Sequence, residues 1–235
     1  MKTKHLSRKS AKGDVQDFLG KMERMPVLRK AENRGRLIFS MDATASREPM
    51  WDQASRIQSQ MFEVTRNLGG LDIQLCYYHG FGIFHASPWS DHAAALSREM
   101  NSVRCLAGHT QIQRVLQHAL SESKIQKVNA VIFIGDCMEE DANILCNLAG
   151  QLGILGVPIF IFQEGDEPTA ASVFRRLADL SHGAYCYFNA NSAEHLKDLL
   201  GAVAVYAAGG LQALDQYTRE HANTVLQLSQ QIRRV

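Results

Sequence analysis

The sequence lacks long apolar runs. Its longest apolar stretches, such as Gly156 to Phe162, are far shorter than the roughly 20 residues that a membrane-spanning helix needs, so we expect no membrane helix. The first residues, Met1 to His5, contain no apolar core of the kind that a secretory signal peptide requires. The sequence therefore predicts a cytoplasmic protein.

Cysteine is sparse and unpatterned. The five cysteines are scattered, and none belongs to a Cys-x-x-Cys pair. This distribution argues against a disulfide framework and against a zinc cage, and most of the five are interpreted as small buried apolar residues. No helix carries a His-x-x-x-His pair, so a histidine-rich zinc centre is not expected either.

Signatures of phosphate chemistry are also missing. The chain has no Gly-x-x-x-x-Gly-Lys loop, and Gly80-x-Gly82 is too short for a dinucleotide fingerprint. Thr44 stands where an aspartyl-phosphate enzyme would need a second aspartate. No Lys or Arg occurs between Lys127 and Arg175, whereas the same stretch contains seven acids. This imbalance favours a bound cation over a bound phosphate.

The composition is otherwise that of an ordinary globular protein, with 235 residues, 46% hydrophobic and 21% charged. Charge is unevenly distributed, because residues 1–36 hold 11 Lys or Arg against 4 Asp or Glu. The basic arm has no aromatic interleaving and no recognised nucleic-acid module, so we interpret it as a solvated tail and disfavour nucleic-acid binding.

Apolar strand patterns alternate with amphipathic helix patterns along most of the chain. Arg36–Met41 reads as a buried strand, Met50–Leu68 as a helix, and Asp72–His79 with Ile83–Ala86 as a hairpin at one sheet edge. Strands and helices then alternate from residue 128 to residue 206. This pattern predicts a doubly wound α/β fold: a mainly parallel central sheet with one antiparallel edge strand and helices on both faces.

The chain divides into three parts on these patterns. Residues 1–34 form a basic extension that includes a short apolar pattern from Val15 to Met22, and residues 35–207 form the α/β domain. Gly209-Gly210 then interrupts the chain. Residues 208–235 are predicted to form a C-terminal amphipathic helix, and its narrow apolar seam is expected to pack on the domain, on the N-terminal helix or on another protein.

Five oxygen-bearing side chains are candidates for one metal site. Asp42, Thr44 and Ser46 follow the first strand at alternate positions, Thr110 opens an amphipathic helix, and Asp136 ends a second buried strand. Hard oxygen donors suit Mg²⁺ or Mn²⁺, and the two carboxylates would face one crevice if their strands are neighbours. The competing interpretation is that the hydroxyls cap helices and the carboxylates bond backbone donors at strand ends.

With these residues the chain resembles the von Willebrand factor A (VWA) domain family and its metal-ion-dependent adhesion site, MIDAS. The family pattern is Asp-x-Ser-x-Ser, then a Thr, then an Asp. Asp42, Thr44, Ser46, Thr110 and Asp136 match it, with Thr44 in place of the usual Ser but keeping a hydroxyl. The resemblance covers roughly residues 35–205. It implies strand order 3-2-1-4-5-6 and a role as an adaptor, in some members alongside ATPases or chaperones.

Three functions remain open. The expected one is a binding module, not an enzyme, in which the metal keeps an open position for an Asp or Glu of a protein partner. His109 and Glu139 are its predicted rim contacts. The second is a metal-dependent hydrolase, for which His109, Glu139, Glu140 or Asp141 would have to act as the base. The third is a metal-free scaffold that acts through its terminal helices.

Two further residues near the predicted crevice are assigned ordinary roles. Cys137 follows Asp136 and could approach the crevice, but it is interpreted as a loop thiol. Ser46 is not expected to be a catalytic nucleophile, because no nucleophile-elbow sequence surrounds it.

Overall fold

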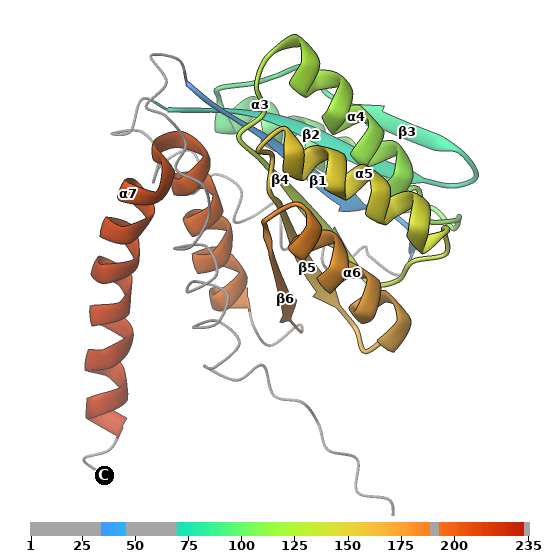
Figure 1. Ribbon diagram of the computed structural model, residues 1–235. Helices are drawn as coiled ribbons and strands as arrows, with labels where there is room; N and C mark the ends of the chain where they lie inside the picture. The colour runs from blue at the N-terminus through green and yellow to red at the C-terminus, as the bar shows by residue number, and fades with distance from the viewer. Residues whose placement is uncertain (1–33, 46–69, 189–192, 233–235) are drawn as a thin grey trace, which may run out of the picture.

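The computed structural model of the protein describes residues 34–45, 70–188 and 193–232 (Figure 1). In the last helix, side chains are described for residues 197–214, 216 and 217. The helix expected over Met50–Leu68 and the apolar pattern from Val15 to Met22 lie outside the described residues, as does Ser46.

A six-stranded sheet forms the centre of the described chain, in the order β3-β2-β1-β4-β5-β6. β2 and β3 pair antiparallel, and the other neighbours pair parallel. The mainly parallel sheet with one antiparallel edge strand is confirmed, as is the predicted strand order. The strands are β1 Gly35–Asp42, β2 Leu71–His79, β3 Ile83–Ala86, β4 Ala130–Gly135, β5 Ile159–Glu164 and β6 Ala184–Phe188.

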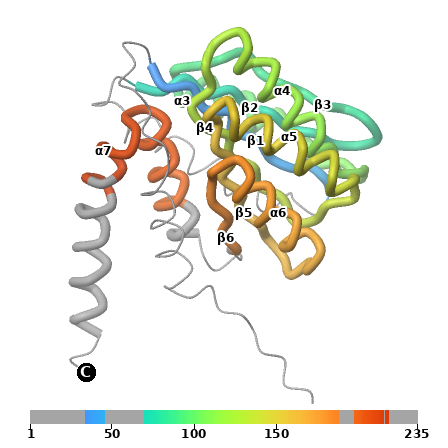
Figure 2. The backbone as a smooth tube through the Cα atoms, viewed as in Figure 1, coloured from blue at the N-terminus to red at the C-terminus, as the bar shows by residue number. Residues whose placement is uncertain are grey.

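Helices cover both faces of this sheet. α4, α5 and α6 lie on one face, and the part of α7 that is coloured in Figure 2 lies on the other. α4 begins two residues after Thr110, so Thr110 belongs to the preceding loop and does not open the helix as expected. The helices are α3 Ala93–Ser102, α4 Ile112–Ile125, α5 Ala142–Ile154, α6 Pro168–Leu180 and α7 Ala193–Ile232.

Alternate residues of the strands divide the core into two halves. Leu37 and Phe39 of β1 pack with α3 and α7, whereas Ile38 packs with α4, α5 and α6. All eight residues of β1 are buried because this central strand has a neighbour on each side and helices on each face. Burial on both faces explains why its middle residues, Leu37–Phe39, are a continuous apolar run and do not alternate with polar residues.

α7 consists of two helices that meet at Gly210, as the predicted break at Gly209-Gly210 requires. Gly210 has φ 71° and ψ −165°, a conformation that glycine adopts without a side-chain clash. Beyond it, Leu214 is fully buried and Leu211 packs against the same core as the first half of α7. The segment after the break therefore begins by packing on the domain, which was one of the expected alternatives.

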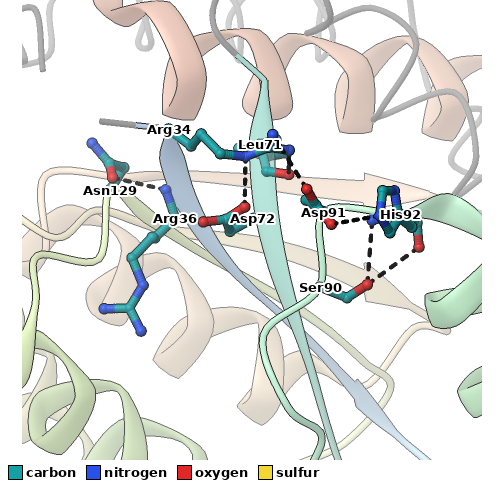
Figure 3. A network of polar contacts seen from close by, with 8 residues as sticks. All are labelled: Arg34, Arg36, Leu71, Asp72, Ser90, Asp91, His92 and Asn129. Atoms are coloured by element: carbon teal, nitrogen blue, oxygen red, sulfur yellow. Dashed lines mark hydrogen bonds and ion pairs between the residues drawn. The ribbon is translucent and has the colours of Figure 1, made fainter. Parts of the chain in front are cut away.

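A network of polar contacts joins the amino ends of β1 and β2 (Figure 3). Arg34 Nε donates to Asp72 Oδ1 at 2.7 Å, and Arg34 Nη1 lies 3.4 Å from Asp91 Oδ2. The backbone amide of Arg36 donates to Asn129 Oδ1 at 2.9 Å. These contacts lie at the amino ends of the strands, at the opposite end of the sheet from Asp42.

Among the helices of the described ranges, none combines the length and the apolar character that crossing a bilayer requires.

Candidate metal site

Two carboxylates lie at the carboxyl ends of adjacent parallel strands. Asp42 is the last residue of β1, and Asp136 follows the last residue of β4. β1 and β4 are direct neighbours, with Met41 paired to Ile134. The condition on which the sequence prediction depended, that the two strands are neighbours, is therefore met. The carboxyl edge of such a sheet is where ligands of doubly wound folds bind.

The fold brings three potential ligand atoms together at this edge. A carboxylate oxygen of Asp42, one of Asp136 and the Sγ atom of Cys137 all lie within 4.8 Å of one another. Asp42 is buried, whereas Asp136 and Cys137 are half-buried. Gly135, which precedes Asp136, packs closely on the Phe133 ring, because a Cβ there would lie only 2.8 Å from it.

Asp42 is fixed by the turn that follows its strand. Its Oδ1 atom accepts a hydrogen bond of 2.7 Å from the backbone amide of Thr44, which is the bond of an Asx-turn. The amide of Ala43 donates to the carbonyl of Tyr78 at 3.0 Å, so the chain still follows β2 for one residue beyond β1. Thr44, two residues after Asp42, is buried.

Thr110 is bonded to the two acids that follow Cys137 in sequence. Its hydroxyl donates to a carboxylate oxygen of Glu140 and accepts from the amide of Glu139 at 3.0 Å. The amide of Thr110 donates to Glu139 Oε2 at 3.0 Å. The hydroxyl has therefore used its hydrogen and one of its two lone pairs, which leaves one lone pair for any further contact.

The loop that carries Thr110 is held against the β2–β3 turn. The amide of His109 donates to the carbonyl of Gly80 at 3.3 Å, and the amide of Leu106 donates to the carbonyl of Ala43 at 3.0 Å. Gly108 is required at this crossing, because a Cβ on it would lie only 2.0 Å from the Gly80 carbonyl oxygen. The Ala-Gly-His-Thr sequence thus brings two chain segments into backbone contact.

The predicted rim residues His109 and Glu139 contact each other. His109 Nδ1 lies 3.1 Å from Glu139 Oε2, both side chains are exposed, and the exposed Phe81 ring packs edge-on against the imidazole. The hydrogen bond from the Thr110 amide lowers the pKa of Glu139, with a further contribution from His109. Glu139 is therefore a stable carboxylate on the surface beside the cluster.

The prediction from sequence interpreted Cys137 as a loop thiol that could approach the crevice, and it gave no role to Tyr78. Burial, together with the charges of Asp136 and other nearby acids, raises the pKa of Cys137 to about 12, so the free site holds a neutral thiol. Tyr78 is fully buried, and its register partner in β1 is Asp42. Burial followed by the negative charges of Asp42 and Glu140 raises the pKa of Tyr78 well above its ordinary value.

These donors fit a divalent cation. Two carboxylates and a sulfur can approach one ion from adjacent strand ends, and the surrounding segment contains acids but no Lys or Arg between residues 127 and 175. Of the five residues predicted as ligands, Asp42 and Asp136 lie together, and Thr110 is bonded to Glu139 and Glu140. Thr44 contributes its amide to Asp42.

Comparison with solved structures identifies the fold. An aerotolerance-related membrane protein from Bacteroides fragilis matches with a TM-score of 0.54 and 11% identity, over 71% of this chain and 98% of that one. The SpRpn10 VWA domain matches with a TM-score of 0.52 and 16% identity, over 71% and 94%. PTMP1 from the mussel byssus, with a zinc-occupied MIDAS motif, matches with a TM-score of 0.57 and 12% identity, over 73% and 46%.

The protein therefore has a VWA fold. A scan against protein-family models found no match, and a search of curated proteins found no significant match.

Proposed function

We propose that the protein is a non-catalytic, divalent-metal-dependent binding module that captures a carboxylate of a protein partner. One observation carries the proposal: Asp42 and Asp136 come from separate strands and place their carboxylates within 4.8 Å of each other. Two carboxylates at this separation repel each other, and a cation between them removes the repulsion. PTMP1, which shares the fold, has a zinc-occupied MIDAS motif, and this supports a metal here.

The surrounding acids support binding more than catalysis. Each candidate carboxylate base on the loop after β4 accepts a hydrogen bond from a backbone amide. Glu139 accepts from the amide of Thr110, Glu140 from that of Gln113 at 3.1 Å, and Asp141 from that of Asn143 at 2.7 Å. Carboxylates that hold loop and helix amides in place are poorly suited to accept a substrate proton. When bound, a divalent cation with an exchangeable position would supply the attraction for an incoming carboxylate. Oxygen donors alone would favour Mg²⁺ or Mn²⁺.

Metal binding is tested by calorimetry and thermal unfolding with Mg²⁺, Mn²⁺ and Zn²⁺ on the wild type and on Asp42→Asn and Asp136→Asn. Asparagine keeps the shape of the side chain and, at Asp42, an oxygen for the Thr44 amide. At a metal concentration of about one hundred times Kd, the wild type should gain about 2.7 kcal/mol, and both variants should lose this gain. Asp166→Asn, which changes an exposed acid of the same segment, is the control and should behave as the wild type.

Partner capture is tested with the same variants as bait. A partner should be retained by the wild type and by Asp166→Asn in the presence of metal, and it should be released by EDTA. Replacing the acidic residues of the partner's contact segment by amides should also release it. Equal metal binding by the wild type and both site variants would overturn the site. A complex that survives chelation would overturn the capture of a carboxylate through the metal.

A further inference from the structure

We infer that Cys137 is a ligand of this metal and that the site takes an ion of the Zn²⁺ class, Zn²⁺ or Co²⁺, in preference to Mg²⁺. The inference rests on the proposed function, since it names the ion for the same site. It replaces the expected all-oxygen set with a set of two carboxylates and one thiolate.

The position of the sulfur carries the inference. Cys137 Sγ lies within 4.8 Å of carboxylate oxygens of both Asp42 and Asp136, and the two carboxylate oxygens lie within the same distance of each other. Bonds of about 2.3 Å to sulfur and about 2.0–2.2 Å to oxygen place donors of one zinc ion at most about 4.5 Å apart. Small side-chain rotations therefore bring the three atoms into one coordination sphere.

The type and number of donors decide between ions. Thiolate is a soft ligand that Zn²⁺ and Co²⁺ accept, whereas Mg²⁺ requires a near-complete shell of hard oxygens. The Thr110 hydroxyl, which would add an oxygen, already donates to Glu140 and accepts from Glu139. Zinc sites that exchange a ligand typically have three protein donors and one open position, which is the number of donors found here. The open position is the one that a partner carboxylate would use.

The thiol must lose its proton for this bond to form. In the metal-free site it donates a hydrogen bond to the Asp136 carboxylate. As the ion binds, the S–H bond breaks, the proton passes to solvent, and the sulfur electron pair forms the bond to the metal. The Asp136 oxygen that accepted the hydrogen bond becomes available to the same ion. No oxidant or reductant takes part.

Tyr78 supplies a second, independent indication that this cluster accommodates a ligand. Its side chain is fully buried, and among the described residues its hydroxyl has no hydrogen-bond partner. Tyr78 and Asp42 are register partners on adjacent strands, so their side chains project from the same face of the sheet. A buried hydroxyl without a partner is rare. Here it is a donor placed among acids, where it can bond an oxygen of the loaded site.

Cobalt spectroscopy tests the inference directly. The full chain is titrated with Co²⁺ under reducing conditions, and a thiolate-to-cobalt charge-transfer band in the near ultraviolet is expected. Zn²⁺ should compete this band away, and excess Mg²⁺ should not. Cys137→Ser should abolish the band and lower Zn²⁺ affinity by at least roughly tenfold, the lower end of the losses seen around metal ligands. Cys105→Ser is the matched control, because Cys105 is also a half-buried cysteine outside a disulfide, and it should keep both properties.

The outcomes separate this inference from the proposed function. If Asp42→Asn abolishes metal binding while Cys137→Ser keeps the wild-type Zn²⁺ affinity and the wild type shows no charge-transfer band, the sulfur is not a ligand and the binding module stands. A stronger affinity for Mg²⁺ than for Zn²⁺ would also overturn the inference. If the wild type binds no divalent ion, both proposals fail.

Discussion

Replacing Tyr78 by phenylalanine should stabilise the metal-free protein. The ring is fully buried and stacks on Phe133 with centroids 6.5 Å apart, and both properties are retained by the new side chain. Only the hydroxyl is removed, and it has no hydrogen-bond partner among the described residues. Because the pKa of Tyr78 is raised well above its ordinary value, the phenol is neutral at ordinary pH and the substitution removes no charge.

The size of the gain follows from two opposing terms. A buried polar group without a partner costs about 1–3 kcal/mol of desolvation, which the substitution recovers. The void left by one hydroxyl, on the order of 10 Å³, costs about 0.2 kcal/mol. We therefore expect the free energy of unfolding to rise by about 1–2 kcal/mol. For a chain of this size each kcal/mol corresponds to about 2–4 °C in Tm.

Urea unfolding in EDTA measures this change, with an unaltered m value as the sign that the unfolding reaction is the same. Tyr185→Phe is the matched control, because the Tyr185 hydroxyl donates to Oε1 of the buried Gln163 at 2.7 Å. Its removal should destabilise the protein by about 0.5–1.5 kcal/mol. If Tyr78→Phe also destabilises the protein by that amount, the hydroxyl is hydrogen-bonded in the free protein, and the reasoning about an unsatisfied donor is refuted.

Two further substitutions test the C-terminal segment and a half-buried histidine. Leu214→Ala should lower the free energy of unfolding by about 2–5 kcal/mol, since Leu214 is fully buried. Gln216→Ala, at an exposed position, is the control. If both variants leave the urea midpoint equally unchanged, the segment after Gly210 is a free arm. Burial lowers the pKa of His118, partly opposed by Glu122, so the folded state prefers the neutral ring. The contribution of neutral His118 to the free energy of unfolding is fully present above pH 6.5, and it is lost as the pH falls through the lowered pKa. His118→Gln should flatten this loss in unfolding measured over a pH series, and an unchanged slope would contradict the assignment.

Much of the fold was predictable from local patterns. Buried strands on both faces of a parallel sheet read as continuous apolar runs, and β1, β4 and β5 all have this character. The hairpin of β2 and β3 was predictable from the glycines between the two strand patterns, and Gly80 and Gly82 both have positive φ. The break in α7 was predictable because Gly209-Gly210 interrupts a helical pattern. Helix starts were less certain, and α4 begins after Thr110 because Gln111 is its N-cap.

The sequence by itself determined that Asp42 and Asp136 lie at the ends of two strands, because each comes directly after an apolar run. No local pattern could place β1 beside β4, because strand order depends on how crossovers pack; the family resemblance implied this order, and the tertiary structure established it. That adjacency brings the two carboxylates and the Cys137 sulfur together. Similarly, register across β1 and β2 pairs Tyr78 with Asp42, and loop packing bonds Thr110 to Glu140. These contacts join residues distant in sequence, so their side-chain partners are fixed by packing and not by spacing along the chain.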